Sequence, residues 1–582
     1  VAELAGSYRF LRRLENRLQE RNDEQTHDLP RDETGRARLA LAMGMPDWPA
    51  LATVIAQHRD RVSSHFRALV FAPAAPTEGE AGRALVSLLE DQVDVARRSE
   101  LLRVAGLAEA EAVSARLELL RDSAYYRRLD DTGRRRLHTL LPSLLQSLAG
   151  RGAEALALGR LLHVLESIGG RTVYLSLLNE NAVARRRLVE LCAQSQFLTD
   201  QIASFPLLLD ELLDERLFES TPTRAEFEHD LRVRMAGAGV DDPEHQVELL
   251  RQFQRAAVFR VAVPDLTGRL PLMKVSDRLT DIAELIVGEA LDLSWQQIVA
   301  RHGVPQYGPD EAHLAGAGVI VVAYGKFGGI ELGYGSDLDL VFLHDSSGDV
   351  QHTTGPKPVD NGVFFLRLVQ RLVHVLAVHT AAGRLYEVDT RLRPSGKGGL
   401  LVQSIEGFGD YQRAEAWTWE HQALLRARVV AGPAALRDRF ESLRRDVLRH
   451  AVRRATLRDD VRTMRERMRA ELSRSGPGQF DLKQDPGGIT DVEFLAQYWT
   501  LLWSERYEEL VTYSDNIRQL ESLASADLVP QSTVDVLTAA YRAYRQRMHH
   551  LSLDAADNVV PAEEFAETRA AVTAIWTATM EG

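Results

Sequence analysis

The sequence predicts an α+β protein that is mostly helical, with a small mixed-sheet domain between an N-terminal and a C-terminal helical bundle. Helical periodicity runs almost throughout from Ala84 to Gly303 and returns in the last part of the chain. Between these stretches, two apolar runs, Val319 to Ala323 and Leu338 to Leu343, are typical of buried strands. At 582 residues the chain is too long for one ordinary core, so two to four domains are expected.

Composition narrows the class of protein. The chain is 45% apolar and 26% charged, as globular proteins are, and its single cysteine, Cys192, excludes an intramolecular disulfide and any cysteine-rich metal site. The net charge of −13 argues against nucleic acid as the main partner. No apolar run is long enough to span a bilayer, and no signal-peptide pattern is present. We therefore expect a soluble, cytoplasmic protein without a membrane or nucleic-acid partner.

The stretch from Val319 to Leu343, VIVVAYGKFGGIELGYGSDLDLVFL, carries the strongest chemical signal. A glycine-rich turn follows the first strand run, and Asp337 and Asp339 stand at the head of the second. Residues two apart on a strand point to the same face, so both carboxylates aim into one volume. Such carboxylates repel each other, and hard divalent cations, above all Mg²⁺ in the company of phosphates, neutralise them well.

A third acid supports this interpretation. The stretch from Arg384 to Pro394 alternates like a further strand and carries Asp389, with Arg391 and Arg393 at the same period. A neighbouring strand can bring Asp389 beside the first pair, and three carboxylates with fixed cations suit two-metal phosphoryl chemistry. An isolated Asp-x-Asp more often marks a surface loop, but the glycine turn, the strand context and the third acid favour a site.

The amino-acid sequences of these segments resemble those of a known family. A glycine pair, a short spacer and two aspartates on a strand resemble the polymerase-beta type of nucleotidyltransferase. More narrowly, the chain resembles glutamine synthetase adenylyltransferase, a bifunctional adenylylating and deadenylylating family with two such domains in tandem. The segments that carry the resemblance read GKFGGIELGYGSDLDLVFLHD, YEVDTRLRPSGKGGLLV and EAWTWEHQALLRARVV. The last two match the adenylylating, C-terminal copy.

The resemblance implies a reaction and a set of roles. The reaction is transfer of AMP from ATP to a tyrosine of glutamine synthetase with release of pyrophosphate, in regulation of nitrogen metabolism. It implies that two Mg²⁺ ions are held by Asp337, Asp339 and Asp389, the last beside the incoming tyrosine oxygen. Glutamine and a PII-type signal protein are the implied regulators. The nucleotide-binding residues that we expect on this basis are Gly328, Gly329, Ser336 and, as weaker candidates, Lys326, Arg391 and Arg393.

The resemblance also implies a domain layout. Residues 1–71 are expected to be the last helices of a truncated first, deadenylylating half, because Tyr8, Arg9, Arg12 and Leu18 recur at a fixed offset as Tyr541, Arg542, Arg545 and Leu551. Residues 72–83 are then a linker, 84–310 a helical domain, 311–432 the catalytic domain and 433–582 a C-terminal helical domain.

Several motifs allow two interpretations. Trp417 and Trp419 belong either to the core or to a platform near ATP. The arginine-rich stretch from Arg444 to Arg469 is either a solvated helix face or a docking surface for an acidic partner. Lys483, in a segment that both halves of the family share, is within possible reach of a phosphate.

Three alternative functions stay open from the sequence. The nearest is the phosphorolytic deadenylylating activity of the sister domain, against which the second and third motifs argue. Another small-molecule nucleotidyltransferase on the same fold is disfavoured by the long helical flanks. A catalytically silent regulatory or docking module is the third, although all three carboxylates are present.

Overall fold

The computed structural model describes residues 29–30, 32–70, 95–169, 171–214, 217, 220–237, 242–379 and 383–582, with single positions at 7, 10, 11, 13, 14, 17, 18 and 85. The whole predicted linker, 72–83, and Tyr8, Arg9 and Arg12 of the predicted repeat lie outside the described residues. The chain divides into two compact units, the first made of Val1–Leu158 with Ile168–Val189 and the second of Gly159–Ser167 with Glu190–Gly582. The predicted domain boundaries stay predictions.

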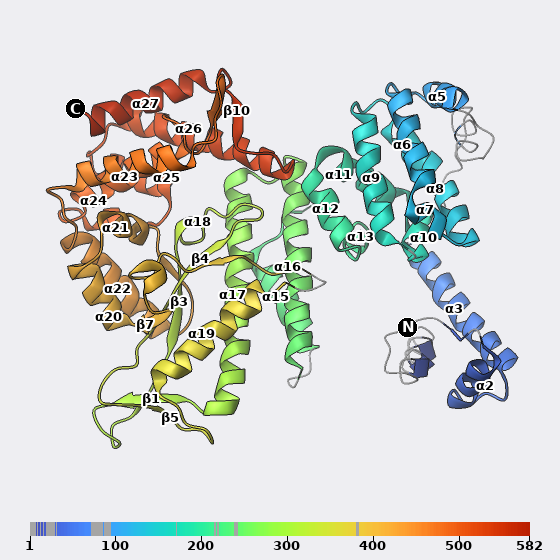
Figure 1. Cartoon of the computed structure of the whole chain (residues 1–582), viewed down its shortest axis with the longest axis horizontal. Helices are drawn as coiled ribbons and strands as arrows, with labels where there is room; N and C mark the ends of the chain where they lie inside the picture. The colour runs from blue at the N-terminus through green and yellow to red at the C-terminus, as the bar shows by residue number, and fades with distance from the viewer. Residues whose placement is uncertain are drawn as a thin grey trace. The chain divides into compact units, whose positions relative to one another are not determined.

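The first unit is helical. Leu14 and Leu18 share a small core with Leu39 of α2 and with Leu51 and Ile55 of α3. The helices are α2 (Glu33–Ala42), α3 (Trp48–Val70), α5 (Val95–Val104), α6 (Ala110–Asp122), α7 (Ala124–Arg128), α8 (Asp131–Leu148), α9 (Glu154–Ile168), α10 (Thr172–Glu180) and α11 (Ala182–Gln194), of which α9 and α11 run on into segments of the second unit (Figure 1).

The second unit begins with helices that lead to the sheet. Asp242 accepts a hydrogen bond from the backbone N–H of His245 at 3.0 Å, and Pro243 follows it, a combination that begins a helix. The helices are α12 (Gln196–Ser204), α13 (Leu208–Glu211), α15 (Arg224–Ala236), α16 (Pro243–Leu266) and α17 (Leu272–His302). The long helix α17 packs against α16 and against α19 (Asn361–Ala377), which follows later in the chain.

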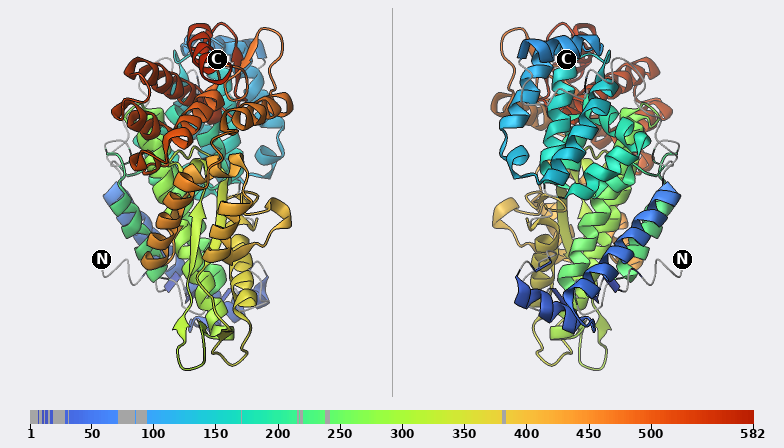
Figure 2. Two further views of the ribbon diagram at one scale, coloured as in Figure 1. Left: turned by 90° about the vertical axis from the view of Figure 1, so that its left-hand side faces the viewer. Right: turned by 90° about the vertical axis from the view of Figure 1, so that its right-hand side faces the viewer.

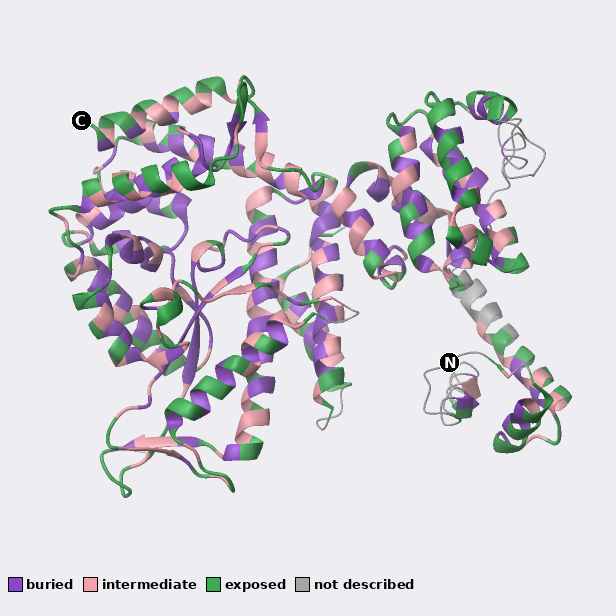
Figure 3. Cartoon of the chain, in the orientation of Figure 1, coloured by how far each residue is buried: buried purple, intermediate pink, exposed green. Residues whose placement is uncertain are grey.

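A mixed five-stranded sheet forms the centre of this unit (Figure 1). The strands run in the order β6 (Val388–Asp389), β4 (Leu338–His344), β3 (Val319–Ala323) and β8 (Arg428–Ala431), and β7 (Val402–Ser404) also pairs with β4. β3 is antiparallel to β4 and β8, whereas β6 and β7 are parallel to β4. The two strands predicted from apolar runs are thus confirmed, and both are buried along nearly their whole length (Figure 3).

The C-terminal helices pack directly on this sheet. Ile320 and Val322 of β3 share one core with side chains of α22, α24 and α26. The helices are α18 (Gly325–Gly328), α20 (Ile405–Ala414), α21 (Thr418–Leu425), α22 (Ala434–His450), α23 (Leu457–Leu472), α24 (Ile489–Trp503), α25 (Asn516–Ser525), α26 (Gln531–Leu553) and α27 (Ala566–Met580), with the short 3-10 helices η2 (Gly396–Gly398) and η3 (Glu508–Val511). The sheet and this bundle therefore form one hydrophobic unit.

Two small sheets complete the second unit. One contains β1 (Pro305–Gly308), β2 (Ala315–Gly316) and β5 (Val350–Thr353), and the other pairs β9 (Gln479–Asp481) with β10 (Val559–Pro561). The two views of Figure 2 show β1 and β5 at one end of this unit and α26 and α27 at the other. The α+β, mostly helical fold class is confirmed. No helix among the described residues has the length and apolar character that crossing a membrane requires.

Three expectations from the sequence need correction. The strand expected over Arg384 to Pro394 is only two residues long, because the chain turns after Asp389. The stretch Arg444 to Arg469 is two helices, and Arg444 and Arg465 are buried rather than solvated. Each of these two guanidiniums donates to backbone carbonyls, Arg444 to Leu424 and Arg465 to Gln484, which offsets the cost of burial. The interpretation of Trp417 as a core residue is wrong, because 65% of its surface is exposed to solvent.

Candidate active site

Three carboxylates meet at one end of the central sheet. Asp339 lies on β4 and is the register partner of Asp389 on the parallel strand β6. Asp337 immediately precedes β4, two positions before Asp339. One ligand oxygen from each of the three acids lies within 4.8 Å of the others. The structure thus brings together the three acids that the sequence singled out, although they come from separate segments.

The negative charges of Asp337 and Asp389 act on the carboxyl group of Asp339. Burial, and after it the neighbouring charges of Asp337 and Asp389, raise the pKa of Asp339 to about 6. A carboxyl with such a pKa is costly to ionise unless a cation is supplied. A donor set made only of carboxylate oxygens is the kind that hard cations such as Mg²⁺ prefer, so the residues fit a divalent metal site.

Arg391 already neutralises one member of the group. Its Nε donates to Asp389 Oδ2 at 2.6 Å, its backbone N–H donates to Oδ1 at 2.8 Å, and its Nη2 also pairs with Oδ2. The side-chain hydrogen bond from Arg391 is the main reason that the pKa of Asp389 is lowered. Asp389 is therefore a weak base while this pair is formed.

Arg393 has a different environment from the one expected. Its guanidinium donates to the backbone carbonyls of Thr390 at 2.7 Å and Gly399 at 3.2 Å, and to that of Lys397. These bonds tie together the turn that follows β6. The structure therefore places Arg393 as a support of the loop that carries Asp389.

The glycine turn packs closely around the acids. Gly325 has φ +55°, and a Cβ at this position would collide with Oδ2 of Asp339. A Cβ on Gly328 would collide with the backbone carbonyl of Arg426, and one on Gly329 would crowd the Arg426 side chain. The glycines are needed because the turn lies against Asp339 on one side and Arg426 on the other.

The N–H groups of the glycine pair are already used. Gly328 N–H donates to the carbonyl of Tyr324 at 2.9 Å, and Gly329 N–H donates to that of Gly325 at 3.1 Å. The expected presentation of both N–H groups to a triphosphate is therefore not seen in this conformation. Close packing, rather than free donors, explains why glycine stands at these positions.

Ser336 and Lys326 each adjoin in sequence a residue of the site, Asp337 and Gly325. Ser336 precedes Asp337, and its Oγ accepts a hydrogen bond from the backbone N–H of Gly333 at 3.1 Å, which closes the turn before β4. Lys326 lies on α18, next to Gly325. Lys326 is exposed at the surface, and partial loss of hydration beside the neighbouring protein is the largest cause of its lowered pKa. Both positions can face a polyanion, and their roles stay predictions.

A buried polar network under the turn is a feature that the sequence did not reveal. Glu331 pairs with Arg426, and both side chains are almost fully buried, 2% and 7% exposed. Asn516 of α25 donates to Glu331 through its backbone N–H and its side-chain amide. Ser514 donates to the carbonyl of Gly328 at 2.8 Å. Ser514 and Asn516 of the C-terminal part thus fix the glycine turn through hydrogen bonds. The available signal was a charged residue between apolar neighbours, Ile330 and Leu332.

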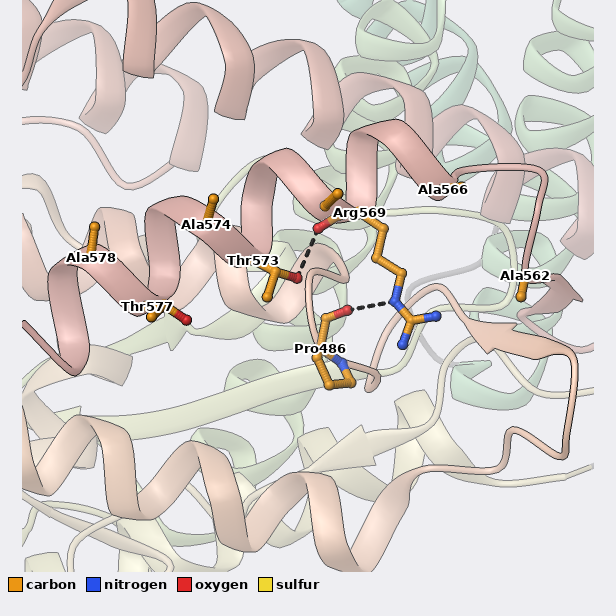
Figure 4. A pocket seen from close by; sticks show the side chains of 9 residues that line it. Pro486, Ala562, Ala566, Arg569, Thr573, Ala574, Thr577 and Ala578 are labelled. Carbon is orange, nitrogen blue, oxygen red and sulfur yellow. Dashed lines mark hydrogen bonds between the residues drawn. The ribbon is translucent and has the colours of Figure 1, made fainter.

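Two cavities differ in their relation to the acids. One of about 260 Å³ lies beside the turn before β4 and is lined by Ser336, Tyr386, Glu387 and Arg255 among others. Another of about 890 Å³ lies along α27, where Arg569 donates to the carbonyl of Pro486 at 3.0 Å and small side chains form most of the wall (Figure 4). None of the three acids lines the second cavity.

Comparison with family models assigns most of the second unit. Residues 185–443 match the model described as glutamate-ammonia ligase adenylyltransferase, and this segment contains all three acids. Residues 1–70 and 462–567 both match the model described as GlnD PII-uridylyltransferase. One model thus matches two segments, which include the positions of the repeat noted in the sequence.

Curated relatives match along the whole chain. The bifunctional glutamine synthetase adenylyltransferase/adenylyl-removing enzymes of Thioalkalivibrio sulfidiphilus and Nitrosococcus oceani are 46% and 45% identical, over 100% of this chain and 60% of each relative. The enzyme of the same name from Pseudomonas aeruginosa is 43% identical over 99% of this chain and 60% of its own length. The chain therefore spans 60% of the length of these relatives. The chain is thus similar to the glutamate-ammonia ligase adenylyltransferase family over residues 185–443, and to these bifunctional enzymes along its whole length.

Proposed function

We propose that this chain transfers AMP from ATP to a tyrosine of glutamine synthetase and releases pyrophosphate, a magnesium-dependent reaction of the cytoplasm. The observation that carries the proposal is the group of three carboxylates whose ligand oxygens lie within 4.8 Å of one another. It occurs in a chain that is 46% identical to an enzyme named for this activity. Three converging carboxylates are the usual framework for two-metal phosphoryl transfer.

The reaction replaces one oxygen substituent of the α-phosphorus by another. The phenol oxygen of the acceptor forms a bond to the α-phosphorus, the bond from that phosphorus to the bridging oxygen breaks, and pyrophosphate leaves with the electron pair. Asp337, Asp339 and Asp389 would hold two Mg²⁺ ions, which would supply the positive charge that stabilises the phosphates and lowers the phenol pKa from about 10.

The residues of the chain have separate roles in this proposal. Asp339, on the rigid strand β4, and Asp337, just before it, fix the position of the phosphates, and Asp389, on β6, serves the side of the acceptor. Asp389 takes the phenol proton only after Arg391 has released its carboxylate, because the present pair lowers the pKa of Asp389. Ser336 and Lys326 face the nucleotide. Arg391 then becomes available for the charge of the transition state.

Regulation by a PII-type signal protein and by glutamine belongs to the same proposal. Its support is the match of residues 1–70 and 462–567 to a model described as GlnD PII-uridylyltransferase. Residues 462–567 include Asn516, so a regulator that binds this segment can act on the acids through the network of Asn516 and Glu331.

Adenylyl removal is the second candidate, because the names of the relatives carry both activities. One experiment separates the two. The chain is incubated with ATP labelled in the α-phosphate, Mg²⁺ and unmodified glutamine synthetase, and transfer to protein is measured, with a glutamine synthetase that lacks the acceptor tyrosine as control. We expect label on the unmodified protein and none on the control.

The reverse direction is tested with adenylylated glutamine synthetase and inorganic phosphate. We expect no rapid release of AMP as ADP through a dedicated site. Phosphate-dependent release that survives Asp337→Asn, together with no forward transfer, would assign the chain to adenylyl removal instead.

A further inference from the structure

A closed turn leads into the group of acids. Gly333 N–H donates to Ser336 Oγ at 3.1 Å, and Ser336 N–H donates to the carbonyl of Gly333 at 3.2 Å. Asp337 follows directly, and Leu338 then begins β4. A displacement of this turn therefore moves the carboxylate of Asp337 relative to that of Asp339, which the strand holds in place.

Packing alone does not fix this turn. The cavity of about 260 Å³ lies along it and is lined by Tyr334, Gly335 and Ser336 from the turn itself. A Cβ added at Gly335 would meet nothing within 4 Å. A segment that borders a cavity lacks dispersion contacts on that side, so directed hydrogen bonds have to keep it in place.

Tyr334 supplies such a hydrogen bond from within the turn. Its side chain is buried, and its Oη donates to Oδ2 of Asp265, on α16, at 2.9 Å. Burial, and after it the charge of Asp265, raises the pKa of Tyr334 well above its usual value, so the hydroxyl keeps the proton that it donates. The ring also contacts the rings of Phe197 on α12 and His549 on α26, with centroids at 4.9 Å and 5.2 Å.

The oxygen that accepts this hydrogen bond is held from a third segment. His549 Nε2 lies 2.5 Å from the same Oδ2 of Asp265, and the two side chains are only 6% and 8% exposed. In the chain, 284 residues separate Asp265 from His549. Because a buried polar group is costly to leave without its partners, the carboxylate stays where both contacts are made.

The same face of α26 also holds the start of the segment that leads to the turn. Arg545 donates through Nη2 to the backbone carbonyl of Glu331 at 2.9 Å. Arg545 and His549 are four positions apart, and residues with this spacing lie on one face of a helix. The helix α26 therefore contacts this segment at Glu331 and again at Tyr334.

We propose that Tyr334 is a positioning residue for Asp337, and that Asp265 and His549 act through it. We call Tyr334, Asp265 and His549 the clamp. The clamp fixes the turn so that the carboxylate of Asp337 stays directed at the volume that it shares with Asp339. That this volume holds a metal ion rests on the proposed function. Groups that orient a metal ligand commonly change metal affinity by about tenfold or more.

The test measures binding of Mn²⁺ to the full chain by electron paramagnetic resonance, because carboxylate oxygens accept Mn²⁺ as they accept Mg²⁺. Tyr334→Phe removes only the hydroxyl and keeps the ring and the net charge, so it should weaken Mn²⁺ binding by about tenfold. The matched control is Tyr544→Phe. It removes another buried hydroxyl, which donates to the carbonyl of Gly487 at 2.9 Å, and should lower Tm similarly without changing the Mn²⁺ affinity.

A second variant tests whether Tyr334 acts through Asp265. Asp265→Ala removes the acceptor and should weaken Mn²⁺ binding at least as much as Tyr334→Phe. The combination of the two should cause no further loss, because the hydrogen bond is already absent. Asp265→Asn keeps an acceptor oxygen and should restore most of the affinity. Additive losses in the double variant would overturn the action through Asp265.

The outcomes for the clamp and for the function are separable. Mn²⁺ binding that Asp337→Asn abolishes and Tyr334→Phe leaves unchanged would overturn the clamp and leave the proposed function in place. Equal weakening by Tyr544→Phe would also overturn the clamp. Mn²⁺ binding that depends on Asp337 and Tyr334, in a chain that transfers no AMP to glutamine synthetase, would uphold the clamp and refute the function. With activity present, Tyr334→Phe should raise the Mg²⁺ concentration needed for half-maximal transfer, and saturating Mg²⁺ should restore most of the rate.

Discussion

Asp339 and Asp389 are register partners on the parallel strands β4 and β6, so their side chains lie on the same face of the sheet. Asp339 lies on a continuous, buried strand. Asp389 ends a strand of two residues and forms a hydrogen-bonded ion pair with Arg391. The two acids therefore differ in rigidity and in charge environment, and we expect their loss to have different effects.

Loss of either acid of the Asp337 and Asp339 pair should remove AMP transfer. Asp337→Asn and Asp339→Asn each remove a charge that the metal site needs, so activity should fall by about a thousandfold or more. In the presence of Mg²⁺, the thermal stability of both variants should stay close to that of the unaltered chain. Near-normal turnover in either variant would show that these residues are not metal ligands.

The metal-free protein should lose stability as the pH rises through the raised pKa of Asp339. The folded-state pKa of about 6 lies above the ordinary aspartate value of 3.8. The folded protein therefore binds the proton more tightly, and this contribution is full below about pH 4 and lost above about pH 6. Between those limits, Asp339→Asn should become more stable relative to the unaltered chain, by up to about 3 kcal/mol.

Denaturation of both proteins in chelator, at pH 5 and at pH 7.5, measures this difference. Mg²⁺ should abolish it at the higher pH. A difference that does not change with pH would argue against the raised pKa. The lowered pKa of Asp389 acts in the opposite sense and at lower pH, where stability falls as that group is protonated.

Gly325→Ala should damage the metal site through a steric collision. The new Cβ would meet Oδ2 of Asp339, and Gly325 has φ +55°. Gly335→Ala is a matched control, because Gly335 has φ +68° but a Cβ added there would have nothing within 4 Å. Both variants should lose about 1 kcal/mol from backbone strain. Only Gly325→Ala should weaken Mg²⁺-dependent ATP binding, measured by calorimetry, and equal binding in the two would refute the contact.

Asp389→Asn should separate nucleotide binding from chemistry. If Asp389 serves the acceptor side, its loss removes an interaction of the transition state and leaves ground-state binding intact. MgATP should bind within a few-fold of normal, while single-turnover transfer slows by about a hundredfold or more. A parallel fall in binding and rate would mean that Asp389 holds the nucleotide metal instead.

Glu331→Gln should destabilise the contact between the glycine turn and the C-terminal bundle. It removes one of the two carboxylates paired with the buried Arg426 and leaves Glu493 at 3.3 Å as the other, which we expect to cost about 2 kcal/mol in the free energy of unfolding. Glu508→Gln breaks the more exposed pair with Arg449, in which Glu508 is 56% exposed, and should change stability by less than about 1 kcal/mol. Denaturant titration followed by tryptophan fluorescence compares them, and similar midpoints would contradict the importance of the buried pair.

Local patterns in the sequence were enough for part of the site. The apolar runs of β3 and β4 and the spacing of Asp337 and Asp339 express a period of two, which any strand imposes. The same reasoning predicted too long a strand around Asp389. The turn that follows is held by hydrogen bonds from Arg393, and these do not disturb the alternation of residues from which the strand was predicted. It also assigned the glycine pair to phosphate binding, whereas the close approach of Arg426 explains both glycines.

By itself, the sequence determined the α+β class, the two central strands, the three acids and the family resemblance, since each depends on residue type and short-range spacing. Only the tertiary structure decided that Arg391 neutralises Asp389 and that Glu331 and Arg426 form a buried pair. The second of these pairs joins segments far apart in the chain. Their physical basis is the burial of charges, whose partners are fixed by packing and not by any local pattern.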